Sequence, residues 1–271
     1  MVMGQRQVEV LADKGAIATR ATALVVERIE AVLARKRFCS VVLSGGSTPK
    51  PLYAALAERS LPWDRLLIFW GDERYVPSDH PDSNEKMARE AWLDRVPIPA
   101  DQVFAMPTGA GDPAIDAAAY GDILQQVFEA PDSRFREERP DGEPWRWDIV
   151  LLGMGDDGHT ASLFPGTEIL EETDALVAVG QKGDQPRISL TFSALNRSDW
   201  VAFLVAGANK QEPLKQVLPV SLGIQSPASV TGEGRSPLVQ QYPSSGIQPS
   251  GDMLWLLDEA ASAELPPDLL P

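Results

Sequence analysis

Three short apolar runs, each ending in a glycine-containing polar segment, constrain the fold of this chain more than any other feature. The runs cover residues 38–43, 66–70 and 147–152, and the polar segments begin at residues 44, 71 and 153. Uninterrupted apolar runs of this length, rich in Val, Ile, Leu and aromatic residues, are typical of strands that are buried on both faces of a parallel sheet. The chain is therefore predicted to contain parallel strands whose ends carry the polar segments.

Helical and strand-like patterns alternate along the rest of the chain. We predict an α/β fold with an open, mostly parallel sheet and helices on both faces, because strand and helix patterns alternate repeatedly. The expected helices lie at 14–36, 84–93, 113–129 and from 210 onward, and the further strands at 7–11, 175–179, 186–190, 200–206 and 253–257.

The domain organisation is predicted to be simple. A length of 271 residues with no internal repeat favours a single domain over residues 1–271. Residues 219–250 are rich in Ser, Pro, Gly and Gln without a helical or strand period, so we predict a long irregular loop there.

The charge balance excludes a large class of partners. The chain has 24 Lys and Arg against 39 Asp and Glu, a formal net charge of −15. Nucleic-acid binding depends on a basic surface that displaces counterions, so we predict no nucleic-acid partner, and anionic membranes are disfavoured for the same reason. The single cysteine, Cys39, cannot form an intrachain disulfide, and the N-terminal residues lack the apolar stretch of a secretory signal. Both observations predict a cytoplasmic protein.

The first polar segment, Ser44 to Lys50, has the composition of an anion-binding turn. Ligands of such sheets bind beyond the carboxyl ends of the strands. Paired glycines allow close approach of a ligand to the backbone, a hydroxyl residue can cap the following helix, and the N-terminus of that helix attracts anions. An ordinary tight turn is the alternative. The candidate residues are Ser44, Gly45, Gly46, Ser47 and Thr48, with Ser47 or Thr48 as the expected cap.

The other two segments carry ionisable groups. Asp72 and Arg74 follow the second run, where they could form either a site or a solvated turn. Asp157 and His159 flank Gly158 after the third run, and a histidine in a glycine turn is rarely a core residue. No second His or Cys lies at zinc spacing, so we predict no metal site, and no nucleophile-elbow serine motif is present.

Taken together, these segments resemble the 6-phosphogluconolactonase family. The resemblance covers nearly the whole chain in the expected order, and only 219–250 departs from it. It is carried by Ser44-Gly-Gly-Ser-Thr-Pro49, Trp70-Gly-Asp-Glu-Arg-Tyr-Val-Pro77 with Ser83-Asn84, Gly153-Met-Gly-Asp-Asp-Gly-His-Thr-Ala-Ser-Leu-Phe-Pro165, and more weakly by Arg187-Ile-Ser-Leu-Thr, Gly207-Ala-Asn-Lys210 and Trp255-Leu-Leu-Asp258.

The resemblance implies a Rossmann-like fold and the hydrolysis of 6-phospho-D-glucono-1,5-lactone to 6-phosphogluconate, the second step of the oxidative pentose phosphate pathway. By similarity, His159 is the base that activates water, and Asp157 is expected to orient it. Arg74 and Lys210 match phosphate-binding positions, Arg187 is a third candidate, and Asp72 and the first loop are expected to bind the sugar. The family implies a phosphosugar lactone as substrate, no metal or organic cofactor, and a monomer or homodimer.

Two other functions remain open. Isomerases and deaminases of glucosamine 6-phosphate share the fold, and in such an enzyme Asp72 would move a proton between C1 and C2. A sugar-phosphate sensor domain of a transcription regulator would need a DNA-binding segment ahead of the first strand, and only about six residues precede it.

Overall fold

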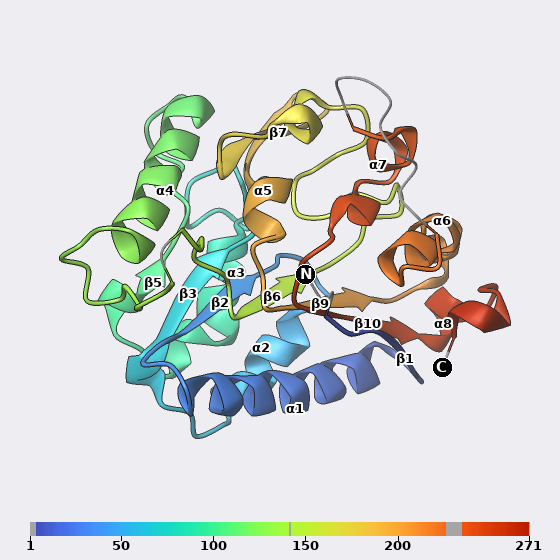
Figure 1. Cartoon of the computed structure of the whole chain (residues 1–271), viewed down its shortest axis with the longest axis horizontal. Helices are drawn as coiled ribbons and strands as arrows, with labels where there is room; N and C mark the ends of the chain where they lie inside the picture. The colour runs from blue at the N-terminus through green and yellow to red at the C-terminus, as the bar shows by residue number, and fades with distance from the viewer. Residues whose placement is uncertain (1–3, 141, 226–234, 271) are drawn as a thin grey trace.

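A seven-stranded parallel sheet forms the centre of the molecule (Figure 1). The structure is a computed structural model and describes residues 4–140, 142–225 and 235–270. The strand order is β1-β10-β9-β6-β2-β3-β5. The strands are β1 (Arg6–Leu11), β2 (Cys39–Leu43), β3 (Leu66–Trp70), β5 (Val103–Phe104), β6 (Ile149–Leu152), β9 (Trp200–Val205) and β10 (Asp252–Asp258). The predicted α/β fold with an open parallel sheet is confirmed.

The central strands are the ones that the apolar runs predicted. Every residue of β2, β3 and β6 is buried, and so is every residue of β9. Aromatic rings fill one face of the sheet, where Phe69 packs against Phe104 and Trp147 with ring centroids 4.8 and 4.9 Å apart. Burial of these side chains removes apolar surface from water on both faces of the sheet and holds the strand ends in place.

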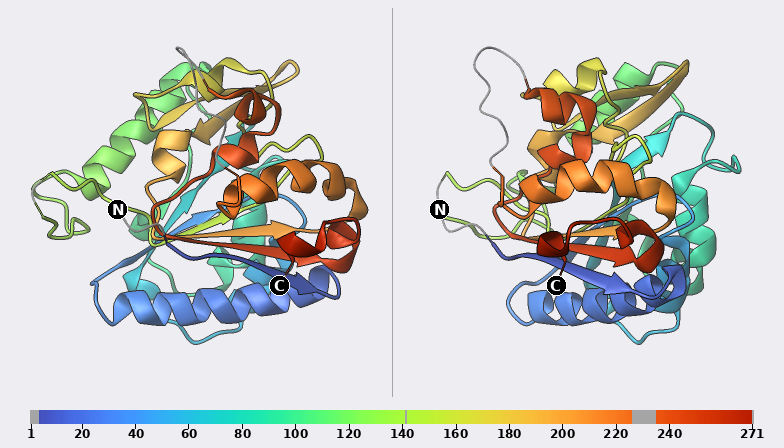
Figure 2. Two further views of the ribbon diagram at one scale, coloured as in Figure 1. Left: turned by 45° about the vertical axis from the view of Figure 1, so that its right-hand side comes forward. Right: turned by 90° about the vertical axis from the view of Figure 1, so that its right-hand side faces the viewer.

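Helices cover both faces of the sheet. Helix α1 (Lys14–Leu33) and helix α2 (Lys50–Ala57) lie on one face, and α3 (Asn84–Ala91) packs against α2. Helices α4 (Pro113–Phe128) and α6 (Gln211–Ser221) lie on the other face (Figure 2). The short helix α5 (Phe192–Leu195) precedes β9, and the short helix α8 (Glu259–Ser262) follows β10. Within the described residues, no helix combines the length and the apolar character needed to cross a bilayer.

A second, antiparallel sheet was not predicted. It contains β4 (Asp72–Arg74), β8 (Gln185–Leu190) and β7 (Val177–Lys182) in the order β4-β8-β7. The strands predicted at 175–179 and 186–190 correspond to β7 and β8, which lie in this sheet and not in the parallel one. Gly183, with a φ of +57°, allows a tight turn between β7 and β8, so the two strands pair with each other as a hairpin. Helix α4 packs against this small sheet.

The predicted loop at 219–250 is also partly wrong. Helix α6 continues through Pro219 to Ser221, and α7 spans Pro237–Gln241. A 3-10 turn follows at Pro243–Gly246. Proline suits the first positions of a helix, and the Ser236 hydroxyl accepts from the N–H of Val239, so a Ser- and Pro-rich composition here starts a helix. The part of this prediction that falls on 226–234 lies outside the described residues.

Candidate active site

The carboxyl ends of the central strands open onto one cavity of about 360 Å³. Its walls are the loops that follow β2, β6 and β9, together with residues of the small sheet. Every site residue predicted from the sequence lines this cavity except Asp157, which contacts His159. The lining residues from the prediction are Ser44, Gly45, Gly46, Ser47, Thr48, Asp72, Arg74, His159, Arg187 and Lys210.

The glycine loop begins at a backbone position that is held by a buried tyrosine. The Tyr53 hydroxyl accepts from the N–H of Ser44 at 2.9 Å and donates to the carbonyl of the same residue at 2.8 Å. Gly46 then has a φ of +96°, a left-handed conformation that other residues rarely adopt. The chain can therefore turn sharply between the end of β2 and the start of α2.

The expected hydroxyl cap of α2 is wrong. Pro49 occupies the N-cap position and makes no side-chain capping bond, while the Ser47 hydroxyl accepts from the Lys14 ammonium at 2.9 Å. The N–H groups in the first turn of α2 are therefore not satisfied by a capping side chain. A helix N-terminus with free N–H groups is a favourable binding site for an anion.

His159 and Asp157 form a hydrogen-bonded pair. The distance between His159 Nδ1 and Asp157 Oδ1 is 2.5 Å, and the same oxygen accepts from the His159 backbone N–H at 3.0 Å. Burial raises the pKa of Asp157, but the hydrogen bonds from His159 outweigh burial and lower this pKa to about 2. An ionised carboxylate can only accept, so Nδ1 must carry a proton, and in the neutral imidazole the lone pair is then on Nε2.

Gly155 makes room for this pair, and Gly158 allows the chain to turn between the two residues. A Cβ at Gly155 would lie 2.1 Å from Nδ1 of His159 and 2.5 Å from Oδ1 of Asp157, so no side chain fits there. Gly158 has a φ of +80°, and the N–H of Gly155 donates to the carbonyl of His159 at 2.8 Å. On another side, the ring of Phe164 packs 4.3 Å from that of His159. Glycine is therefore required at position 155, because the His159 ring and the Asp157 carboxylate fill the space that a side chain would need.

The Asp72 carboxylate is buried and bonded at both oxygens. Its Oδ2 accepts from the Ser162 hydroxyl at 2.6 Å, and its Oδ1 accepts from Nδ2 of Asn84 at 3.5 Å. Ser162 belongs to the loop that carries His159, and the neighbouring Ala161 has a φ of +47°. Positive φ is strained for alanine, and such strain concentrates at functional sites. The start of β4 and the loop after β6 are thus joined beside the cavity.

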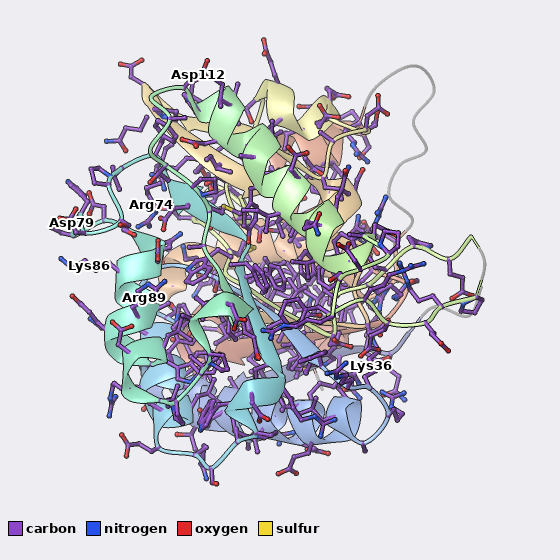
Figure 3. All side chains as sticks on the ribbon, turned by 90° about the vertical axis from the view of Figure 1, so that its left-hand side faces the viewer. Lys36, Arg74, Asp79, Lys86, Arg89 and Asp112 are labelled. Carbon is purple, nitrogen blue, oxygen red and sulfur yellow. The ribbon has the colours of Figure 1, made fainter. Side chains whose placement is uncertain are left out.

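Four cations line the cavity, namely Arg74, Lys182, Arg187 and Lys210. Arg74 on β4 lies opposite Arg187 on β8 in the antiparallel register, and in Figure 3 Arg74 lies above the start of α3. The pKa of Arg187 is lowered, first by burial and then by the charge of Arg74. The pKa of Lys210 is lowered by burial and by Lys182, against the opposing effect of Asp156 and Asp157.

These cations are not neutralised by neighbouring carboxylates. Within the described part of the chain, none of the four forms an ion pair, and the buried Nε atoms of Arg74 and Arg187 have no hydrogen-bond partner. Partly desolvated cations such as Arg187 and Lys210, without an ion-pair partner among the described residues, favour an anionic ligand. A charge of −15 on the whole chain makes this local concentration of positive charge more informative.

Sequence reasoning missed three of the residues that complete the cavity. Lys182 lies at the end of β7, where no motif marks it, and it became recognisable only when the hairpin was seen. Asn84 and Phe164 stood in the segments that carry the family resemblance, but no role was assigned to them. Phe164 could have been identified from its place after the glycine motif at 153–158.

The chain is similar to known proteins over almost its whole length. The model of the family described as glucosamine-6-phosphate isomerases/6-phosphogluconolactonase matches residues 12–255. A 6-phosphogluconolactonase of Nostoc sp. is 47% identical, and one of Synechocystis sp. is 45% identical, each over 96% of this chain and 99% of the relative.

Solved structures show the same relationship. The 6-phosphogluconolactonase of Trypanosoma brucei has a TM-score of 0.75 at 30% identity and covers 97% of this chain and 100% of its own. That of Thermotoga maritima has a TM-score of 0.75 at 28% identity, with 94% and 100% covered. A monomeric glucosamine-6-phosphate deaminase, 16% identical with a TM-score of 0.73, shares the fold. These matches place the chain among α/β enzymes. It belongs to the glucosamine-6-phosphate isomerase/6-phosphogluconolactonase family.

Proposed function

We propose that this enzyme hydrolyses 6-phospho-D-glucono-1,5-lactone to 6-phospho-D-gluconate, the second step of the oxidative pentose phosphate pathway. The observation that carries the proposal is a His159–Asp157 pair at 2.5 Å in a cavity that also holds four cations. The relatives from Nostoc and Synechocystis, similar over almost their whole length, are named 6-phosphogluconolactonases. A base next to an anion-binding cavity is the combination that hydrolysis of a phosphorylated lactone requires.

His159 acts as the general base in this proposal. Its Nε2 takes a proton from water while the water oxygen bonds to C1, and the carbonyl becomes a tetrahedral oxyanion. The oxyanion then collapses, the bond from C1 to the ring oxygen breaks, and the imidazolium returns its proton to the leaving alkoxide. Asp157 positions the ring and stabilises the imidazolium, since its ionised carboxylate accepts from Nδ1.

Arg74 and Lys210 hold the phosphate in this proposal, with Arg187 as a third candidate. A guanidinium can bind two phosphate oxygens at once, and an ammonium adds a point charge. The Ser44–Thr48 loop supplies backbone N–H groups at the start of α2, and Asp72 accepts from sugar hydroxyls. The cations of the cavity thus hold the one charged group of the substrate.

The test compares the wild-type protein with His159→Asn. We expect opening of the phosphorylated lactone well above the spontaneous rate, and a loss in kcat of about 10²-fold or more in the variant. The spontaneous hydrolysis of the lactone is subtracted in every assay. Activity of the variant within a few-fold of wild type would remove His159 from the role of base.

A second assay separates the competing reaction. In the isomerase interpretation Asp72 moves a proton between C1 and C2, so deuterium from the solvent would enter a hexose phosphate, and ammonia would leave glucosamine 6-phosphate. Such exchange by the wild-type protein, with no lactone hydrolysis above the spontaneous rate, would overturn the lactonase proposal.

A further inference from the structure

Asn84 lies at the junction of two segments that line the cavity. It is the first residue of α3, and it is 1% exposed. Its Nδ2 donates to the backbone carbonyl of Asp72 at 2.9 Å and to Oδ1 of the same residue at 3.5 Å. On its other side the amide lies against Gly45, where a Cβ would be 1.8 Å from Oδ1 and 2.3 Å from Cγ of Asn84. One side chain therefore contacts both the loop after β2 and the segment after β3.

The space that Asn84 occupies explains the glycine at position 45. Gly45 does not have the positive φ of Gly46, so its backbone alone would accept an alanine. The obstacle to a side chain at this position is the Asn84 amide. Residues 45 and 84 are thus restricted by each other, although the chain between them includes the whole of α2 and β3.

Hydrogen bonds determine the orientation of the amide. Both groups of Asp72 that face it are oxygen acceptors, so the nitrogen must point toward Asp72 and the oxygen toward Gly45. Within the described residues Oδ1 has no hydrogen-bond donor, and Gly45 is its neighbour. A glycine Cα–H is a weak donor that suits this place.

A buried carboxylate holds the backbone of Asn84. Glu73 is 3% exposed, and its Oε1 accepts from the Asn84 N–H at 2.7 Å. Its Oε2 accepts from the N–H of Glu85 at 2.7 Å and from the Ser83 hydroxyl at 3.1 Å. Since Glu73 follows Asp72 directly, the segment that carries the cavity carboxylate also anchors the first turn of α3. Asn84 is therefore held at its backbone and reaches the cavity loops with its side chain.

We propose that Asn84 is a positioning residue for the reaction: it sets the distance between the glycine loop and the Asp72 carboxylate, and thereby the places at which the substrate is held. The proposal rests on the lactonase function proposed above. Displacements of about 1 Å in groups that hold a substrate can lower the rate on the order of 10²-fold, so loss of this contact should be visible in kinetics.

Kinetics of four single variants form the first test. We expect Asn84→Ala to lower kcat/KM about tenfold or more. Asn84→Asp keeps the size but replaces the donor that faces Asp72 by a carboxylate oxygen, so it should lose as much as the alanine variant. Gly45→Ala should also lose activity, because its Cβ collides with Asn84.

Asn196→Ala is the matched control. Asn196 also joins two segments, since its Nδ2 donates to the carbonyl of Gly246 at 3.0 Å and its Oδ1 accepts from the N–H of Gln248 at 2.7 Å, but it does not line the cavity. It should keep kcat/KM within about twofold even if its melting temperature falls as far as that of Asn84→Ala. Wild-type kinetics of Asn84→Asp would overturn the proposal, since filling space would then be sufficient.

The second test needs no substrate. In the double variant Gly45→Ala/Asn84→Ala the added methyl group enters the space that the amide has left. We expect its melting temperature to be no lower than that of Asn84→Ala alone, so that the two changes are not additive. If the decreases in melting temperature of the two single variants add up in the double variant, Asn84 and Gly45 do not restrict each other, and the proposal is overturned. If the melting temperatures are not additive but neither the wild-type protein nor any variant opens the lactone, the proposed function is wrong. The contact between Asn84 and Gly45 is then still supported.

Discussion

Asp157 determines the tautomer of His159, because its carboxylate accepts a hydrogen bond from Nδ1 of the imidazole. The pKa of Asp157 is about 2, below the ordinary value of 3.8, because the hydrogen bonds from His159 outweigh the effect of burial. A group whose pKa is lowered by folding stabilises the folded state above its ordinary pKa, and this contribution disappears as the pH falls through the folded value. The side chain is 44% exposed, so solvent weakens the effect.

Asp157→Asn tests this linkage. The amide keeps the shape but not the charge, so the wild-type protein should melt at a higher temperature than the variant near pH 6. The difference should shrink as the pH is lowered from about 4 toward 2. Thermal unfolding followed by circular dichroism at several pH values measures it. A difference that stays constant over this range would show that the carboxylate charge does not contribute. We also expect a lower kcat, since the amide no longer selects one tautomer.

At the scale of elements, the small antiparallel sheet brings two arginines together. Arg74 and Arg187 are 113 residues apart in the chain, and the pairing of β4 with β8 places them opposite each other at the cavity. Lys210 comes from the 3-10 turn after β9. No single element could hold these like charges close together, because their repulsion has to be offset by the packing of the sheets.

Arg74→Ala and Lys210→Ala should each raise KM for the phosphorylated lactone. A charge-assisted contact to a phosphate is worth roughly 1.5–3 kcal/mol, so we expect at least a tenfold effect and a weaker preference for the phosphorylated lactone over plain gluconolactone. Lys215→Ala is the control, because Lys215 pairs with Glu212 and Glu264 away from the cavity. If both site variants keep the wild-type preference, the phosphate is bound elsewhere, and Arg187 is the next residue to replace.

A hydrogen bond joins β4, which begins at Asp72, to the loop that carries His159. Ser162 is fully buried and donates to Oδ2 of Asp72 at 2.6 Å. Ser162→Ala leaves a buried carboxylate oxygen without this donor, at a cost of about 1–3 kcal/mol. We expect a lower melting temperature together with a lower kcat/KM.

Ser198→Ala separates these two effects. The Ser198 hydroxyl is also buried, but it donates to the carbonyl of Leu195, outside the cavity. This variant should lose stability and keep its activity. Equal activity of the two serine variants would mean that the link between the loops has no role in the reaction.

At the scale of the whole molecule, a chain of net charge −15 gathers four cations in one cavity, and among the described residues none of the four has an ion-pair partner. The cations come from positions 74, 182, 187 and 210, and the base comes from 159. The parallel strands place His159 and Lys210 at one edge of the sheet, since all of their carboxyl ends lie there, and the small antiparallel sheet adds Arg74, Lys182 and Arg187.

The sequence determined most of the sheet and three of the loops that line the cavity. Buried parallel strands need uninterrupted apolar runs, and glycine positions such as 46 and 158 need a conformation that other residues avoid, so both leave a local record in the sequence. For the same reason, His159 could be singled out before its partners were known.

Tertiary structure alone decided which distant residues share the cavity. Contacts between distant segments place Arg74 opposite Arg187, and they bring Lys182 to the wall of the cavity. They also pack Asn84 on Gly45. No local sequence pattern encodes these contacts. Strand patterns at 175–179 and 186–190 were recognised, but their pairing with each other and with β4 was not, because strand propensity does not specify the partner strand. Glycine at position 45 illustrates the same division, since its cause is a side chain 39 positions later in the chain.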